Sequence, residues 1–130
     1  VKWQIRIASG VLLDVKQEDI KIKGAAIECR INAKGGGSID FLHVPGGPGV
    51  RFETALYQGY QVPPFYDSLI GKLVVFALSR EEAIRKMQSA LCELVIEGIP
   101  NNIEEQIDIL DDADFKKGEY YTDFIQRKSL

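Results

Sequence analysis

The feature that most constrains the fold of this chain is a strict alternation of side chains along residues 25–33. Side chains that suit a core occupy the odd positions, and they are Ala25, Ile27, Cys29, Ile31 and Ala33. Because successive side chains of a strand point to opposite faces, this pattern predicts a strand with one face in a core. Glu28 and Arg30 share the other face, where we expect them to form a structural pair.

Further strands are predicted in the first half of the chain. Residues 39–44 and 50–57 are short strand candidates, and the proline- and glycine-rich run 45–49 between them favours a tight loop. Residues 69–78 are almost continuously apolar, which is typical of a strand covered on both faces. Asp67 is expected to hold the turn that leads into this strand.

Helices are predicted to follow the strands. The first begins at Ser79, whose hydroxyl forms a capping box with Glu82, and it ends at Gly98. A second capping box at residues 102–105 begins another helix, and residues 1–8 resemble the middle of an amphipathic helix. Strands followed by helices indicate one α+β domain over residues 1–130, with a mainly antiparallel sheet flanked by helices.

Composition excludes several classes of function. The formal net charge of −3 leaves no excess of Lys and Arg to neutralise phosphates, so nucleic acid is not expected as a partner. No stretch approaches the roughly 20 apolar residues needed to cross a bilayer. No secretory signal is visible, so we expect a cytoplasmic protein whose Cys29 and Cys92 are free, buried thiols. His43 is the single histidine and is expected to be a satisfied polar group on a strand, so no metal site is predicted.

An ordered series of motifs resembles the C-terminal domain of the biotin carboxylase component of biotin-dependent carboxylases. Residues 24–33 are similar to the signature that opens this domain, Gly-His-Ala-Ile-Glu-Cys-Arg-Ile-Asn-Ala. The resemblance continues through residues 45–51, 66–73 and 80–84 and ends at residues 97–102. The series is specific because its members follow in order over nearly the whole chain. Within the family, the parent we expect is the biotin carboxylase of bacterial acetyl-CoA carboxylase, although pyruvate and propionyl-CoA carboxylases carry the same domain.

The resemblance implies a chemistry that this segment does not contain in full. Enzymes of this family carboxylate a ureido nitrogen of biotin, using ATP, Mg²⁺ and bicarbonate, and a biotin carboxyl carrier protein presents the biotin. The nucleotide lid, the metal-binding glutamates and the bicarbonate base belong to an ATP-grasp region, for which these 130 residues show no counterpart. We therefore expect a segment of a larger enzyme that is inactive alone and has no cofactor bound to it.

The resemblance also assigns site residues. Arg51 matches the arginine that faces biotin and bicarbonate, and the alternative is an exposed strand arginine paired with Glu53. Phe76 and Arg80 match positions near the homodimer contact, although an aromatic residue at the end of a buried strand is often part of the core. Thr122 aligns with the adenine side of the nucleotide site.

The chain departs from the family pattern at three neighbouring places. Ala25 stands where the family has His, Lys34 stands where it has Glu, and Gly-Gly-Gly-Ser at residues 35–38 replaces a longer loop. This flexible sequence suggests an engineered linker, and a native glycine-rich turn is the alternative. Two further hypotheses about function follow: a non-catalytic dimerisation or interaction module, and an engineered stand-alone fragment.

Overall fold

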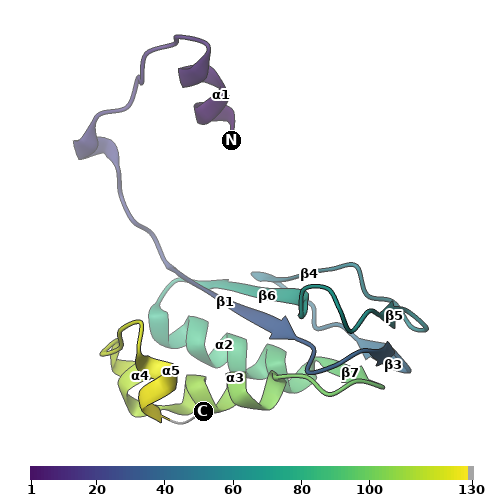
Figure 1. The fold of residues 1–130 in the computed structure, drawn as a ribbon. Helices are drawn as coiled ribbons and strands as arrows, with labels where there is room; N and C mark the ends of the chain where they lie inside the picture. The colour runs from purple at the N-terminus through teal and green to yellow at the C-terminus, as the bar shows by residue number, and fades with distance from the viewer. Residues whose placement is uncertain (129–130) are drawn as a thin grey trace.

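A three-stranded antiparallel sheet forms the centre of the structure, a computed structural model that describes residues 1–128 (Figure 1). Its strands are β1 (Ala25–Asn32), β6 (Leu69–Ala77) and β4 (Val50–Thr54), in the order β1-β6-β4. The alternation predicted for the first strand is confirmed, since Cys29 and Ile31 are buried while Glu28 and Arg30 are exposed.

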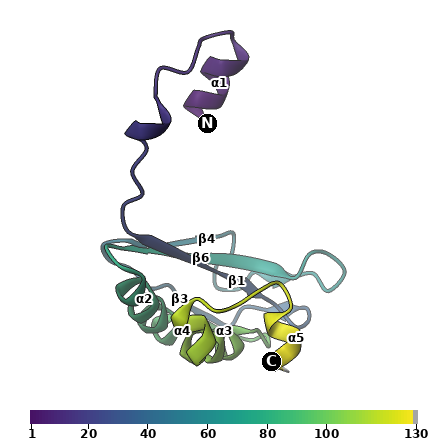
Figure 2. The same ribbon diagram turned by 90° about the vertical axis from the view of Figure 1, so that its left-hand side faces the viewer.

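Four helices follow between residues 80 and 128 and lie on one side of the sheet (Figures 1 and 2). They are α2 (Arg80–Glu93), α3 (Ile103–Asp111), α4 (Ala113–Lys117) and α5 (Phe124–Lys128). The core lies between the sheet and this helical layer. Its fully buried side chains include Leu73 and Val75 of β6, Met87 and Leu91 of α2, and Leu110 of α3. The α+β fold predicted from the sequence is thereby confirmed.

Two short antiparallel ladders extend the body beyond the sheet. In one, β2 (Gly37–Ser38) pairs with β5 (Gln61–Val62), and in the other β3 (Phe41–His43) pairs with β7 (Val95–Glu97). The glycine-rich segment 35–38 is therefore partly a strand. A Cβ at Gly36 would lie 2.9 Å from Pro64, and one at Gly37 would lie 2.9 Å from Ile99, so small residues suit this close packing.

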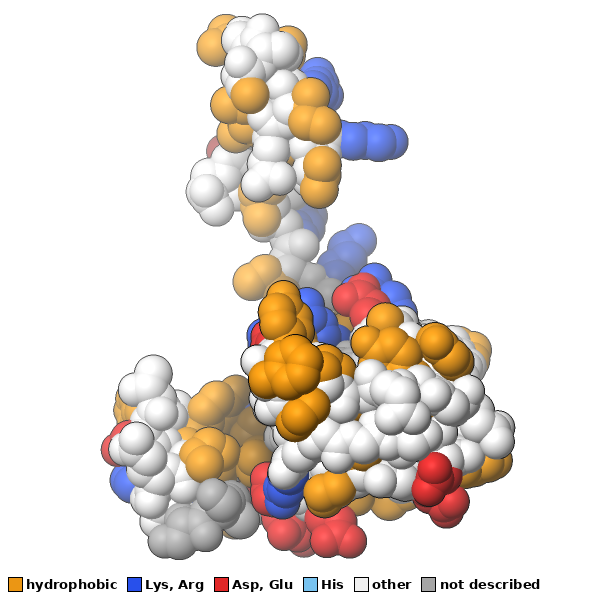
Figure 3. Space-filling model, turned by 45° about the vertical axis from the view of Figure 1, so that its right-hand side comes forward, with side chains coloured by type: hydrophobic (Ala, Val, Ile, Leu, Met, Phe, Trp, Pro, Cys, Tyr) orange, Lys and Arg blue, Asp and Glu red, His pale blue; other side chains and the backbone are white. Residues whose placement is uncertain are grey.

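The first 24 residues form an arm that leaves the body. It carries α1 (Lys2–Ala8) and the 3₁₀ helix η1 (Gln17–Asp19), and neither helix buries a residue. Figure 2 shows both helices away from the body, and Figure 3 shows hydrophobic side chains gathered along the arm. No helix in residues 1–128 combines the length and apolar character that crossing a membrane requires.

Three predictions about the elements are wrong in detail. Helices cover β6 on one face only, and Phe76 on its other face is 48% exposed. The first helix ends at Glu93 instead of Gly98, because Leu94 turns to an extended backbone and β7 follows. Asn102 does not cap α3 with its side chain, which instead bonds the backbone of β1.

Two predictions about side chains also need correction. Cys29 and Cys92 are both free, but only Cys29 is buried, since Cys92 lies on an exposed part of α2. Glu28 and Arg30 share a face, yet no ion pair joins them among the described residues. The side chains stand side by side on a strand with water around them, where a pair gains little.

Candidate functional site

The uncovered side of the sheet holds the predicted site residue Arg51. We call this side the open face, and it consists of Ala26, Glu28, Arg30, Arg51, Glu53, Lys72, Val74 and Phe76. The register places Glu28 and Arg51 on either side of Val74. Within residues 1–128 no helix packs on this face, and α1 stands well away from it (Figure 1), so a charged side chain here can meet a ligand or another chain.

Arg51 presents an accessible guanidinium group. Its side chain is 67% exposed, and its Nε lies 3.1 Å from Oε1 of Glu53 two residues along β4. The exposed pair predicted as an alternative is therefore present. Such a pair contributes little to stability, because water screens both charges. Within residues 1–128 the two Nη atoms of Arg51 have no hydrogen-bond acceptor, so they remain available to a ligand.

A shallow hollow of about 220 Å³ lies beside Arg51 on the open face. Its lining is apolar apart from the guanidinium and consists of Ala26, Gly49, Val50, Arg51, Val74, Val75 and Phe76. A larger hollow of about 340 Å³ lies further along β4 and β6, and Arg51 does not line it. An apolar floor with one cation at its rim suits a small ligand that carries an oxygen anion.

The glycine-rich loop 45–49 leads directly into β4, in which Arg51 is the second residue. The N–H of Phe76 donates to the carbonyl oxygen of Gly49 at 2.8 Å, and the ammonium of Lys86 donates to the carbonyl oxygens of Pro48 and Phe76. Sequence reasoning did not single out Lys86. Its partners lie 38 and 10 residues away, so no local pattern could identify it.

The other predicted site residues lie in different surroundings. Phe76 lines the same hollow as Arg51. Arg80 instead points into the helical layer, where Nη2 donates to the carbonyl oxygen of Phe115 at 2.6 Å and the guanidinium stacks over the Phe115 and Tyr120 rings. Thr122 is exposed in the turn before α5. The roles predicted for Arg51, Phe76, Arg80 and Thr122 stay predictions.

The described residues offer little for metal binding or for chemistry at the Cys29 thiol. No group of three His, Cys, Asp or Glu side chains in residues 1–128 could hold a metal ion. Burial, and after it the nearby Glu28 carboxylate, raises the pKa of the Cys29 thiol to about 12. Cys29 therefore carries no thiolate at neutral pH to act as a nucleophile.

The family of biotin carboxylase C-terminal domains matches residues 28–127. The chain belongs to this family. The biotin carboxylase of Haemophilus influenzae (strain Rd) is 48% identical over 98% of this chain and 30% of its own length. The small subunit of the 2-oxoglutarate carboxylase of Hydrogenobacter thermophilus is 46% identical over 97% of this chain and 28% of its own length.

A solved structure extends the likeness to three dimensions. The biotin carboxylase domain dimer of the 2-oxoglutarate carboxylase from Hydrogenobacter thermophilus was solved with MgADP, ADP and bicarbonate. It matches with a TM-score of 0.86 and 43% identity, over 98% of this chain and 30% of that one. This biotin carboxylase domain thus spans about 30% of the length of such relatives. The relatives also match most of the arm, which lies wholly outside residues 28–127, where the domain family matches.

Proposed function

We propose that this chain is the C-terminal part of an ATP-dependent biotin carboxylase and that it contributes Arg51 to the site for biotin and bicarbonate. The observation that carries the proposal is the accessible Arg51 guanidinium on the open face, beside an apolar hollow. The match to the biotin carboxylase C-terminal domain family supports it, and so does the bicarbonate present in the solved Hydrogenobacter relative.

Arg51 suits two steps of this chemistry. When the ureido nitrogen of biotin loses its proton, negative charge develops on the ring oxygen, and a fixed cation stabilises that charge as it appears. The two Nη atoms can also donate in parallel to two oxygens of bicarbonate or of a carboxylated product. The ion pair with Glu53 lies on the Nε side of the guanidinium and leaves both Nη atoms for the ligand.

The residues described in this chain do not fit ATP and Mg²⁺. No set of carboxylates among residues 1–128 could hold a metal ion, and we assign no step of nucleotide chemistry to them. The Hydrogenobacter relative carries MgADP in a chain more than three times as long as this segment, which supports a nucleotide site formed by the rest of the parent enzyme. We infer that the chain alone does not carboxylate biotin, and Thr122 is proposed to approach the adenine only in that larger assembly.

The parent enzyme is proposed to be a cytoplasmic acetyl-CoA carboxylase that receives biotin on a carrier protein. Relatives named biotin carboxylase, such as those of Haemophilus influenzae and Pseudomonas aeruginosa, support this choice with 48% and 44% identity. Pyruvate and 2-oxoglutarate carboxylases at 44% and 46% identity are the competing parents. Segment 35–38 is proposed to be an engineered replacement of a longer loop.

A non-catalytic dimerisation module is the second candidate function. Phe76 favours it, because a large aromatic side chain that is 48% exposed on a sheet face is suited to burial against another chain. The Hydrogenobacter relative is a dimer of biotin carboxylase domains. Arg80 would join such a contact only if it left its position on Phe115 and Tyr120.

The test of the proposal is a titration of the 130-residue chain with bicarbonate and with biotin, monitored by NMR of the arginine Nε–Hε groups. We expect a saturable shift at Arg51 and at open-face amides, which Arg51→Met abolishes. Arg30→Met removes the other arginine of the same face and should leave the response intact. An equal loss in both variants, or no response of the unaltered chain, would contradict the role of Arg51.

A further inference from the structure

We propose that Lys86 is a positioning residue for Arg51. Its ammonium group ties the glycine-rich loop before β4 to the end of β6, and this tie determines where the Arg51 guanidinium stands on the open face. The importance of that position for ligands rests on the function proposed for Arg51, whereas the tie itself can be tested without a ligand.

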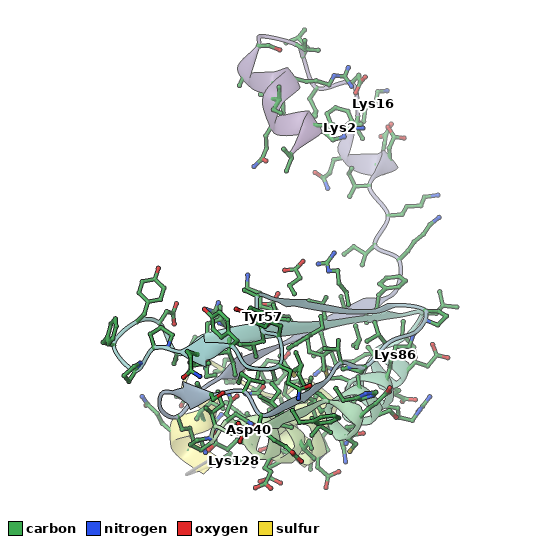
Figure 4. The ribbon with its side chains drawn as sticks, turned by 90° about the vertical axis from the view of Figure 1, so that its right-hand side faces the viewer. Lys2, Lys16, Asp40, Tyr57, Lys86 and Lys128 are labelled. Carbon is green, nitrogen blue, oxygen red and sulfur yellow. The ribbon has the colours of Figure 1, made fainter. Side chains whose placement is uncertain are left out.

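Lys86 joins two segments that are distant in sequence. It reaches from α2 toward the sheet (Figure 4), and its Nζ donates to the carbonyl oxygen of Pro48 at 3.1 Å and to that of Phe76 at 2.8 Å. The N–H of Phe76 in turn donates to the carbonyl oxygen of Gly49 at 2.8 Å. The loop is therefore held to the end of β6 by the backbone hydrogen bond between Phe76 and Gly49 and by the side chain of Lys86.

The close approach of these groups depends on Gly49. Its φ of +72° is a conformation that residues with a Cβ rarely adopt. A Cβ at this position would lie 2.6 Å from the carbonyl oxygen of Phe76 and 3.0 Å from Nζ of Lys86. The loop thus passes so near the end of β6 that one compact ammonium group can reach carbonyl oxygens on both sides.

The tie acts at a short distance along the chain from Arg51. Pro48 lies three residues and Gly49 two residues before it, and Gly49, Val50 and Phe76 line the same hollow as the guanidinium. Lys86 does not line that hollow. It therefore influences the site only through the loop and the end of β6, as a positioning residue does. Without the tie, only the Phe76–Gly49 backbone hydrogen bond and the pairing of β4 with β6 would hold the end of loop 45–49, and Arg51 next to it would sample several positions.

Three variants separate this role from a general effect on stability. Lys86→Met keeps the length and the apolar stem of the side chain but removes its donors. Arg85→Met removes the same charge one residue earlier, from an exposed side chain that has no hydrogen bond among the described residues. Lys86→Arg keeps a cation with several donors and should restore the tie.

The first readout needs no ligand and is made on the 130-residue chain. We expect Lys86→Met to shift and broaden the Arg51 Nε–Hε signal and to speed hydrogen exchange of the Phe76 amide about tenfold, which matches loss of a charge-assisted bond. Arg85→Met should leave both unchanged, and Lys86→Arg should retain them. An unchanged Arg51 signal in Lys86→Met would overturn the proposal, as would the same change in Arg85→Met.

The second readout adds bicarbonate and separates this proposal from the proposed function. We expect Kd at Arg51 to rise about threefold to tenfold in Lys86→Met, while the midpoint of thermal unfolding falls no more than in Arg85→Met. The Arg51 signal can shift in ligand-free Lys86→Met while bicarbonate causes no shift in the unaltered chain. Positioning by Lys86 is then supported and the proposed function fails. If bicarbonate binds both forms equally, positioning by Lys86 is overturned and the proposed function remains.

Discussion

Cys29 and Cys92 show at the scale of single residues how burial changes the chemistry of identical side chains. Cys29 is buried against the core and Cys92 is exposed on α2. We predict that 5,5′-dithiobis(2-nitrobenzoic acid) at pH 8 labels Cys92 within the mixing time, whereas Cys29 reacts only when the chain opens. Cys92→Ser should remove the fast phase and Cys29→Ser should leave it, so two fast thiols in the unaltered chain would contradict the buried position of Cys29.

The raised pKa of Cys29 also sets a direction for stability at alkaline pH. Burial, and after it Glu28, raises this pKa from 9.0 to about 12 in the folded chain. A group whose folded pKa is raised contributes its stability fully below the unfolded value and loses it as pH rises through the folded value. The contribution of Cys29 is therefore present below pH 9.0 and disappears between pH 9.0 and about 12.

Among the polar side chains of the described body, Asn102 is the one whose removal should lower the free energy of unfolding most. Its amide accepts from the N–H of Asn32 at 2.8 Å and donates to the carbonyl oxygen of Arg30 at 3.2 Å. We predict that Asn102→Ala lowers the free energy of unfolding by about 2–3 kcal/mol, because both backbone groups lose a partner in a part-buried place. Urea unfolding measures this loss, and the exposed neighbour Glu104→Ala should change it by less than about 0.5 kcal/mol. Equal losses would contradict the bridging role.

At the scale of elements, α4 and α5 are joined by charges. Asp112 caps α4 by accepting from the N–H groups of Asp114 and Phe115, and Lys128 of α5 lies 2.9 Å from carboxylate oxygens of both aspartates. The hydrogen bond from Lys128, assisted by those two N–H groups, lowers the pKa of Asp112 from its ordinary 3.8. The same contact raises the pKa of Lys128.

The sign of these shifts predicts that acid weakens the Asp112 cap of α4 and its contact with Lys128 of α5. A depressed carboxyl pKa contributes stability that is present above the ordinary value of 3.8 and is lost as pH falls through the folded value. We predict that the Phe115 amide loses protection from hydrogen exchange as pH falls from 4 to 2, after correction for intrinsic exchange. Asp112→Asn should remove this pH dependence, and high salt should weaken it, since both groups are near water. If the protection of the Phe115 amide in the unaltered chain does not change with pH, the prediction is wrong.

At the scale of the whole molecule, the arm and the body differ in how they are stabilised. Isolated helices shorter than about 12–15 residues are marginal in water. The arm offers little packing to offset this, because its helices bury no residue. Large apolar side chains nevertheless remain exposed along it, among them Trp3, Ile5, Ile7, Leu12 and Leu13. Such an uncovered apolar surface favours self-association.

Deletion of residues 1–23 tests this difference. We predict that the free energy of unfolding of the body changes by less than about 0.5 kcal/mol, since no buried contact is lost. Sedimentation velocity should show that self-association decreases at the same time. Trp3→Ser with Ile7→Ser in the full chain is the matched control and should decrease association in the same direction. A body that unfolds after the deletion would show that the arm contributes to its core.

Much of the fold could be predicted because its signals are local. Alternation along residues 25–33 determined which side chains of β1 face the core, and Ser79 does cap α2 by accepting from the N–H of Glu82. Asp67 accepts from the N–H of Leu69 at the turn into β6, as its position predicted. The ordered motifs identified the family, which the match over residues 28–127 confirms.

The sequence by itself therefore determined the main strands β1 and β6, the start of α2, the buried side of β1 and the family of the chain. Only the tertiary structure decided that helices cover one face of β6, that Arg80 turns inward to Phe115, and that Lys86 ties Pro48 to Phe76. The physical reason is the distance along the sequence over which each kind of interaction acts. Strand alternation and helix caps arise from neighbouring residues, whereas a covered sheet face or a side-chain bridge requires segments tens of residues apart to pack together.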